Sequence, residues 1–120
     1  MVNSLIERLT ALFVAPFRPR LTHVLELVNE ARQSLNLPTL DTLPTGDKAR
    51  STRCPLALAL GGIVGVDGIC YENSYTARHV AEAWHTNLRQ QGREKFIVDL
   101  PQTLRAFVRD FDLGAYGKRI

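Results

Sequence analysis

Apolar residues recur every three to four positions in the segment 20–36, which is the clearest pattern in the chain. The positions on this stripe are Leu21, Val24, Leu25, Val28, Ala31 and Leu35. Glu26 and Glu30 lie off the stripe, as expected of a helix that buries one face. Asn36 and Pro38 follow the last apolar position and end the predicted helix.

Three other segments show the same spacing. We predict a first helix at residues 3–14, another at residues 74–90, and a last one after Asp99, which we expect to cap it. Their apolar stripes are Leu5, Ile6, Leu9, Leu12 and Phe13 in the first, Ala77, Val80, Ala81, Trp84 and Leu88 in the second, and Leu104, Phe107, Val108 and Phe111 in the third. A short helix is predicted at residues 54–61, because Pro55 suits the first helical position and two glycines follow.

Short apolar runs that are too brief for helices predict the strands. Residues 63–66 and 69–71 flank an Asp-Gly pair, which favours a two-residue hairpin turn, and residues 95–98 form a third run. A length of 120 residues fits one domain, residues 1–120. The order of elements predicts an α+β fold, in which a small, largely antiparallel three-stranded sheet is covered by four to five helices.

The segment 37–53 is rich in Pro, Thr, Asp and Gly and has no regular pattern. Leu37, Leu40 and Leu43 recur within it, so we expect the segment to be attached to the core. An irregular segment of this length inside a compact domain is often functional.

The end of this segment, residues 46–55, concentrates positive charge and is called the basic loop below. It leads into the N-terminus of the predicted short helix, where unpaired N–H groups and a partial positive charge favour an anion. Its cations and hydroxyls are Lys48, Arg50, Ser51, Thr52 and Arg53. This composition predicts a contact for nucleic acid or for an acidic protein surface, which Arg78 and Arg89 would extend. A solvated loop that only maintains solubility is the competing interpretation.

Overall charge and hydropathy narrow the class of protein only slightly. Fifteen Lys and Arg against twelve Asp and Glu give a net charge of +3, which is compatible with nucleic-acid binding and with many other functions. No apolar run approaches the roughly 18 residues that a membrane span needs. The N-terminus lacks the basic start and the small-residue cleavage site of a signal peptide, so we expect a cytoplasmic protein that does not enter the membrane.

Two cysteines and two of the histidines provide the candidates for catalysis or metal binding. A thiol at Cys54, beside arginines and at a helix N-terminus, would be pushed toward the nucleophilic thiolate, with His79 or His85 as a base. A structural capping cysteine is the simpler interpretation. Cys54, Cys70, His79 and His85 could form a zinc set, but the two histidines lie six residues apart, roughly 240° around a helix. We therefore expect no metal, no cofactor and no enzymatic activity.

Two further features favour interactions with other molecules. Tyr71 and Tyr75 lie near cations in the sequence, where they would either stack on bases or contribute to the core and its rim. The apolar stripe of residues 3–14 would pack inside the domain or, if the core closes without it, bind a partner or a second copy in a homodimer.

Three motifs in the second half of the chain resemble those of a group of short bacterial proteins. They are Leu43-Pro-Thr-Gly46, Cys54-Pro-Leu-Ala57 and Phe107-Val-Arg-Asp-Phe-Asp-Leu-Gly-Ala-Tyr116. The resemblance implies that residues 46–57 and the C-terminal segment belong to one structural unit, and it implies no activity. The leading hypothesis is a small, non-enzymatic binding or regulatory protein that acts through the basic loop. The alternatives are a protein–protein regulator or dimer that uses residues 1–16, and a thiol enzyme that uses Cys54.

Overall fold

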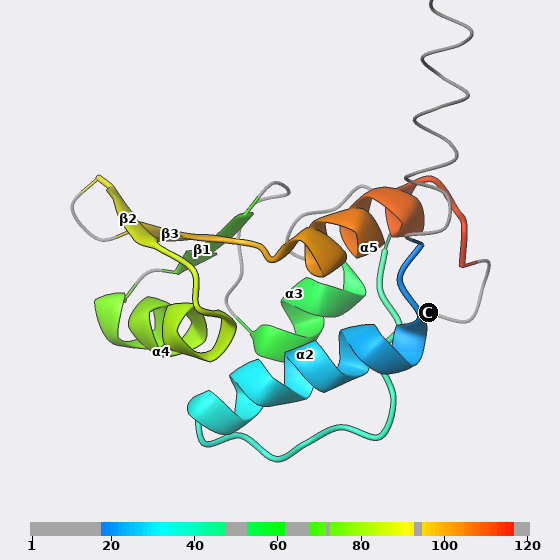
Figure 1. The fold of residues 1–120 in the computed structure, drawn as a ribbon, viewed down its shortest axis with the longest axis horizontal. Coiled ribbons are helices and arrows are strands. Elements are labelled where there is room, and N and C mark those ends of the chain that lie inside the picture. The colour runs from blue at the N-terminus through cyan, green and yellow to red at the C-terminus, as the bar shows by residue number, and fades with distance from the viewer. Residues whose placement is uncertain (1–17, 48–52, 62–67, 72, 93–94, 117–120) are drawn as a thin grey trace, which may run out of the picture.

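The computed structural model describes residues 18–47, 53–61, 68–71, 73–92 and 95–116 (Figure 1). The elements in chain order are helices α2 (Leu21–Ser34) and α3 (Pro55–Leu60), strand β1 (Gly68–Tyr71), helix α4 (Ser74–Trp84), strands β2 (Leu88–Gln91) and β3 (Lys95–Asp99), and helix α5 (Gln102–Asp112). The predicted α+β class is confirmed. The predicted helix at residues 3–14 and the predicted strand at residues 63–66 lie outside the described residues.

The sheet has the strand order β1-β3-β2, and both neighbouring pairs are antiparallel. Consequently β1 and β2 run parallel to each other on either side of β3, and α4 connects them. Helix α4 contacts all three strands and covers one face of the sheet (Figure 1). Val98, the fourth of the five residues of β3, is fully buried, whereas Lys95 at its start is exposed.

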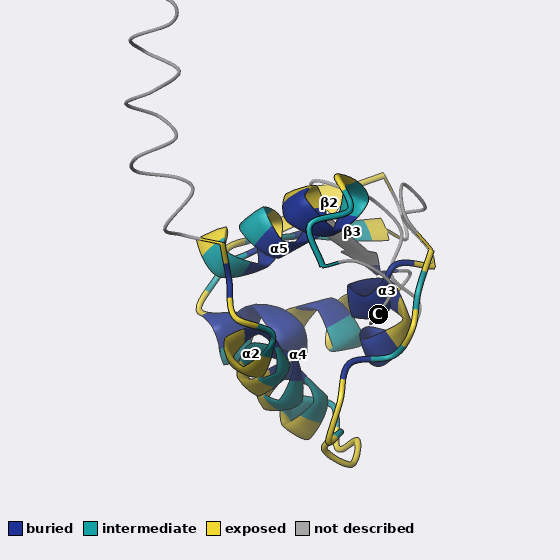
Figure 2. Cartoon of the chain, turned by 90° about the vertical axis from the view of Figure 1, so that its right-hand side faces the viewer, coloured by how far each residue is buried: buried dark blue, intermediate teal, exposed yellow. Residues whose placement is uncertain are grey.

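The core lies where the helices and this covered face meet (Figure 2). Helix α2 packs against α3, α4 and α5 through its buried residues Val24, Val28 and Ala31. The indole Nε1 of Trp84 in α4 donates a hydrogen bond to the backbone carbonyl of Leu27 at 3.0 Å, which ties α4 to α2. The apolar stripes predicted for these segments therefore face the core.

The sheet differs from the predicted one in its third strand. The prediction continued the helix from residue 74 to residue 90, but the helix ends at Trp84 and Leu88–Gln91 forms β2. His85 ends the helix in the left-handed conformation, with φ at 55°, and the Thr86 N–H closes back on the Ala81 carbonyl at 2.9 Å. The helical prediction for residues 85–90 is wrong. Leu88 continues the apolar spacing of the helix, but it lies in strand β2.

The predicted cap of the last helix is also wrong. Asp99 is the last residue of β3, and its carboxylate accepts a hydrogen bond from the guanidinium of Arg89 in β2. Pro101 is the N-cap residue, and its carbonyl accepts the first helical hydrogen bonds, from the N–H groups of Leu104 and Arg105.

The irregular segment after α2 is attached to the core, as predicted. The side chain of Asn29 in α2 donates to the Leu40 carbonyl and accepts from the Leu40 N–H, at 2.9 and 2.8 Å. Leu43 is buried, whereas Leu37 is exposed and does not contribute to the attachment. Arg32 adds a second connection, because its guanidinium donates to the carbonyls of Pro38 and Ala59.

Candidate anion-binding surface

The two ends of the basic loop are held together where the described residues meet it. The Asp47 N–H donates to the Arg53 carbonyl at 2.8 Å, and Arg53 Nε donates to the Asp47 carboxylate at 3.0 Å. This double contact is called the Asp47–Arg53 clamp below. Lys48, Arg50, Ser51 and Thr52 lie outside the described residues, between its two halves.

Gly46 makes the clamp sterically possible. A Cβ at this position would lie 2.5 Å from the Pro55 nitrogen, 2.6 Å from the Arg53 oxygen and 2.7 Å from the Cys54 carbonyl carbon. All three are backbone atoms, which cannot rotate away as the end of a side chain can. The two ends of the basic loop therefore lie against each other only because residue 46 has no side chain.

Cys54 is a structural cap rather than a reactive thiol. Its Sγ accepts a hydrogen bond from the Ala57 N–H at 3.4 Å, and the residue is only 6% exposed. Burial raises the pKa of the Cys54 thiol above its ordinary value, which opposes the thiolate that a nucleophile needs. The thiol-enzyme hypothesis therefore loses its physical basis.

The same cap leaves little of the helix N-terminus for an anion. One N–H group of α3 already donates to Cys54, Pro55 has no N–H group, and the first residues of the helix are buried. Anion binding by this loop accordingly depends on its side chains, not on the helix terminus.

The described histidines do not form an acid–base or metal site. His85 is exposed beyond the end of α4, and His79 is half-buried on the helix. The side chain of Cys70 lies outside the described part, although its backbone pairs with Ile97. Within the ranges that the structure describes, no three His, Cys, Asp or Glu side chains are grouped so that they would hold a metal ion.

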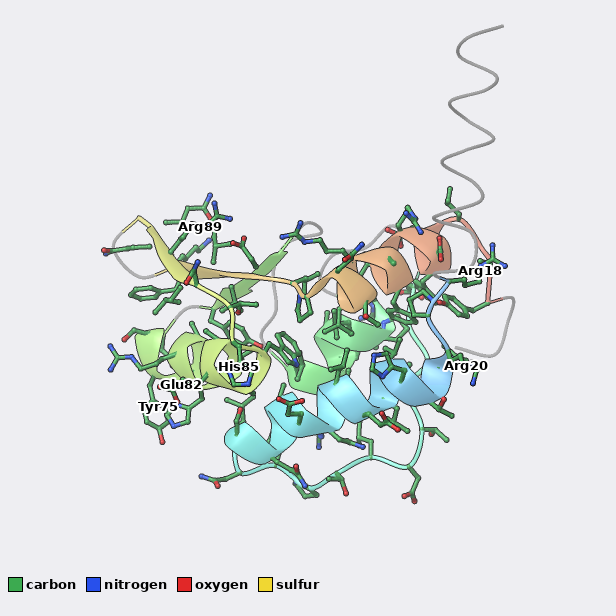
Figure 3. The ribbon with its side chains drawn as sticks, viewed as in Figure 1. Arg18, Arg20, Tyr75, Glu82, His85 and Arg89 are labelled. Atoms are coloured by element: carbon green, nitrogen blue, oxygen red, sulfur yellow. The ribbon has the colours of Figure 1, made fainter. Side chains whose placement is uncertain are left out.

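The structure does not bring Arg78 and Arg89 to one face. Arg78 is exposed on α4, which covers one face of the sheet. Arg89 follows the core-facing Leu88 in β2, and because successive strand residues alternate between faces, Arg89 points to the opposite side. Figure 3 shows Arg89 on the side of the sheet away from α4. Arg89 also donates to Asp99, so its charge is already partnered.

Four of the described cations are free to bind another molecule. These are Arg20, Arg78, Lys95 and Arg105. Within the described part of the chain, they take part in no ion pair and donate no side-chain hydrogen bond. Two of them lie on opposite sides of the sheet. Arg78 lies in the N-terminal half of α4, whereas Lys95 alternates with the core-facing Phe96 along β3 and points away from α4, as Arg89 does.

An exposed aromatic side chain lies on this same end of α4. Tyr75 is 66% exposed, and its ring lies 4.0 Å from the ring of His79, centroid to centroid. His79 Nδ1 donates to the Tyr75 carbonyl at 2.8 Å, which fixes the imidazole under the tyrosine. The sequence analysis missed this pair, although a spacing of four residues places two side chains on the same side of a helix.

Tyr71 does not share this role. It is 2% exposed in β1, and its hydroxyl has no hydrogen-bond partner in the described structure. Burial raises the pKa of this phenol well above its ordinary value, so it stays protonated. Of the two alternatives left open for Tyr71, the core position holds and stacking on bases does not.

The opposite end of the molecule carries a second set of arginines, of which Arg18 and Arg109 are paired. Figure 3 shows Arg18 near α5 and Arg20 at the start of α2. Arg18 and Arg109 both pair with the buried Asp110, at 3.8 and 3.0 Å. The Tyr116 hydroxyl donates to the Pro19 carbonyl at 2.8 Å, which attaches the start of the described chain to the end of α5.

Comparison with protein-family models, with curated proteins and with solved structures finds no match for this chain. No helix in the described part is long and apolar enough to cross a membrane. Arguments about function therefore rest on the geometry and charge of the residues above.

Proposed function

We propose that this protein is a small, non-enzymatic binding protein that contacts nucleic acid through the cations of its basic loop. The contact comprises Lys48, Arg50 and Arg53, with Ser51 and Thr52 as hydrogen-bond donors to phosphate. Arg89 is left out of the proposal because it is paired with Asp99. Arg78 is assigned to a second contact at the end of α4.

The observation that carries this proposal is the Asp47–Arg53 clamp. A backbone hydrogen bond and an ion pair join residues six apart in the chain, and Gly46 allows the close approach. Loop ends that are held together reduce the entropy that a loop loses when it binds. The clamp thus fixes the distance between residues 47 and 53, the two ends of the segment that carries the proposed contact.

The clamp leaves the charge of Arg53 available. The side chains of Arg53 and Asp47 are both more than half exposed, and an exposed ion pair contributes only about 0–1 kcal/mol. A phosphate group can therefore compete for the guanidinium with little energetic loss. Because the backbone hydrogen bond to the Arg53 carbonyl does not involve the side chain, the loop ends stay together when the ion pair is exchanged.

Fluorescence anisotropy with a labelled 20-nucleotide single strand tests the proposal. Replacing Arg50 and Arg53 together with Ala should weaken binding and reduce the slope of log K against log [salt] by about 1.4, since each lost phosphate contact on a single strand contributes about 0.7. The double variant Arg20→Ala and Arg105→Ala is the matched control. It removes the same charge from two exposed, unpaired positions outside the proposed contact.

The outcomes separate nucleic acid from an acidic protein surface. Absence of binding by the unmodified protein at the lowest salt, or an equal loss in both double variants, contradicts a contact at the basic loop. If polyglutamate of equal charge displaces the labelled strand as well as unlabelled DNA does, the target is an acidic protein surface instead.

A second candidate function is protein–protein interaction through residues 1–16. It is favoured by an exposed apolar side chain in the part of the chain to which Arg18 and Pro19 are attached, through Asp110 and Tyr116. Leu113 is 78% exposed, more than any other large hydrophobic residue in the described part. Deletion of residues 1–16 should leave the fold intact and abolish self-association in sedimentation experiments, whereas an unfolded deletion variant would place the segment in the core.

A further inference from the structure

We infer that the outer face of α4 is a stacking surface for one base of a single-stranded nucleic acid. The stacking surface consists of Tyr75, Arg78 and His79. This inference rests on the proposed nucleic-acid function and adds a second contact to it, which distinguishes bases from bare phosphate.

The aromatic part of this surface is held in position before any ligand binds. Asn73 caps α4 by accepting the Thr76 N–H at 2.7 Å, and the buried face of the helix packs on α2 and the sheet. The His79 ring is fixed by its hydrogen bond to the Tyr75 carbonyl and supports the tyrosine ring at 4.0 Å. A prearranged aromatic ring loses little conformational entropy on binding, which favours affinity.

The exposed aromatic ring provides the chemistry that bases require. Two-thirds of Tyr75 is accessible to solvent, and Figure 3 shows this side chain pointing away from the sheet on the outer side of α4. Base stacking on an exposed aromatic ring does not depend on the identity of the base, because every base has a π-face.

The surroundings of Tyr75 favour nucleic acid over an apolar protein partner. Ser74 and Arg78 are exposed on the same part of the helix. Arg78 takes part in no ion pair and no side-chain hydrogen bond in the described part of the chain, so it can meet a phosphate beside a stacked base. A protein hot spot lies in a packed, desolvated pocket, whereas Tyr75 is 66% exposed among polar and charged neighbours.

Glu82 limits where the phosphates can lie. It is exposed four residues after Arg78, on the same side of α4. Its negative charge disfavours a backbone that follows the helix toward His85. The strand is therefore expected to pass over the N-terminal turns of α4.

The test compares a labelled 12-nucleotide thymidine strand with an abasic strand of the same length and charge. Tyr75→Ala should weaken binding of the thymidine strand about 5- to 100-fold, the range expected for one stacked base, and leave binding of the abasic strand unchanged. Tyr75→Phe should retain the affinity of the unmodified protein, because the π-face remains. Leu113→Ala is the control for loss of an exposed apolar side chain elsewhere, and Glu82→Gln should strengthen binding of both strands.

The outcomes separate this inference from the function on which it rests. Equal binding of both strands by the unmodified protein, or a Tyr75→Ala variant that binds the thymidine strand normally, overturns the stacking surface. If Arg50→Ala and Arg53→Ala still weaken binding in that case, the basic-loop function stands alone. If the unmodified protein binds neither strand, the proposed function itself fails. Circular dichroism of each variant verifies that the exposed substitutions leave the fold intact.

Discussion

Replacing Gly46 with Ala should both destabilise the protein and disorganise its proposed contact. A methyl group at this position would lie 2.5–2.7 Å from three backbone atoms of residues 53–55, whereas ordinary contact begins at 3.4 Å. The chain segments must therefore separate by roughly the difference, up to 0.9 Å at the Pro55 nitrogen. A separation of that size would stretch the 2.8 Å hydrogen bond from Asp47 N to the Arg53 carbonyl beyond hydrogen-bond distance.

The expected loss of stability has two parts. Forcing a group into a packed region costs about 1–3 kcal/mol, and a lost hydrogen bond adds about 0.5–1.5 kcal/mol. Together they give about 1.5–4.5 kcal/mol, which shifts a urea midpoint by about 0.8–2.3 M for an m-value of about 2 kcal/mol/M. Fluorescence of the single tryptophan, Trp84, follows unfolding from the interface between α2 and α4.

A matched control separates the steric effect from the general cost of replacing a glycine. Gly92 has a φ of 78° and no atom within 4 Å of an added Cβ, so Gly92→Ala is penalised by its backbone conformation alone. That penalty is about 1–2 kcal/mol, and the basic loop is unaffected. A Gly46→Ala protein whose midpoint lies within 0.3 M of the unmodified protein, or whose DNA affinity is unchanged, would refute the role assigned to the close approach.

Two other substitutions or treatments probe the contacts that hold the loop and its helix. Asn29→Ala removes both hydrogen bonds to the Leu40 backbone and should lower the free energy of unfolding by about 1–3 kcal/mol. Trp84 fluorescence in urea measures this change. An unchanged urea midpoint would show that the loop does not depend on Asn29. Because burial raises the pKa of Cys54, its alkylation midpoint in the folded protein should lie above the ordinary value of 9.0, with Cys54 distinguished from Cys70 by peptide mass spectrometry. The folded state keeps a proton that the unfolded state loses, so stability should fall as pH rises from 9.0 toward the folded pKa. An alkylation midpoint below 9.0 would contradict the burial of this thiol.

Elements that bury one regular face could be predicted from the sequence. The stripe of α2 is preserved because Val24, Val28 and Ala31 face the core through a helix of ordinary length. Strand β3 was also predicted, since its apolar run is too short for a helix and is followed by Pro101.

The boundary between α4 and β2 could not be predicted, because two periodicities overlap there. Leu88 lies four residues after Trp84, so it continues the helical stripe, and it packs against the core from a strand instead. Helix α4 ends at His85, which adopts a left-handed backbone conformation. A glycine at this position would have indicated the helix end from the sequence, whereas a histidine does not.

The sequence indicates which side chains are charged but not which charges remain unpaired. Arg53 and Arg89 look equivalent to Arg78 in the sequence, and both are paired, with Asp47 and Asp99 respectively. These pairings follow from the loop closure and from the β2–β3 register, which depend on contacts in space. The most useful cation outside the loop, Arg78, is distinguished by its exposed position beside Tyr75 and by the lack of a partner in the described structure.

The salt dependence of binding to a single-stranded 20-mer by the unmodified protein tests the central claim most directly. If three to four cations of the basic loop and the stacking surface contact phosphates, at about 0.7 per contact, log K should fall linearly with log [salt] with a slope between about −2.1 and −2.8. Binding that is absent at low salt, or that does not change with salt, would contradict nucleic-acid recognition by this protein.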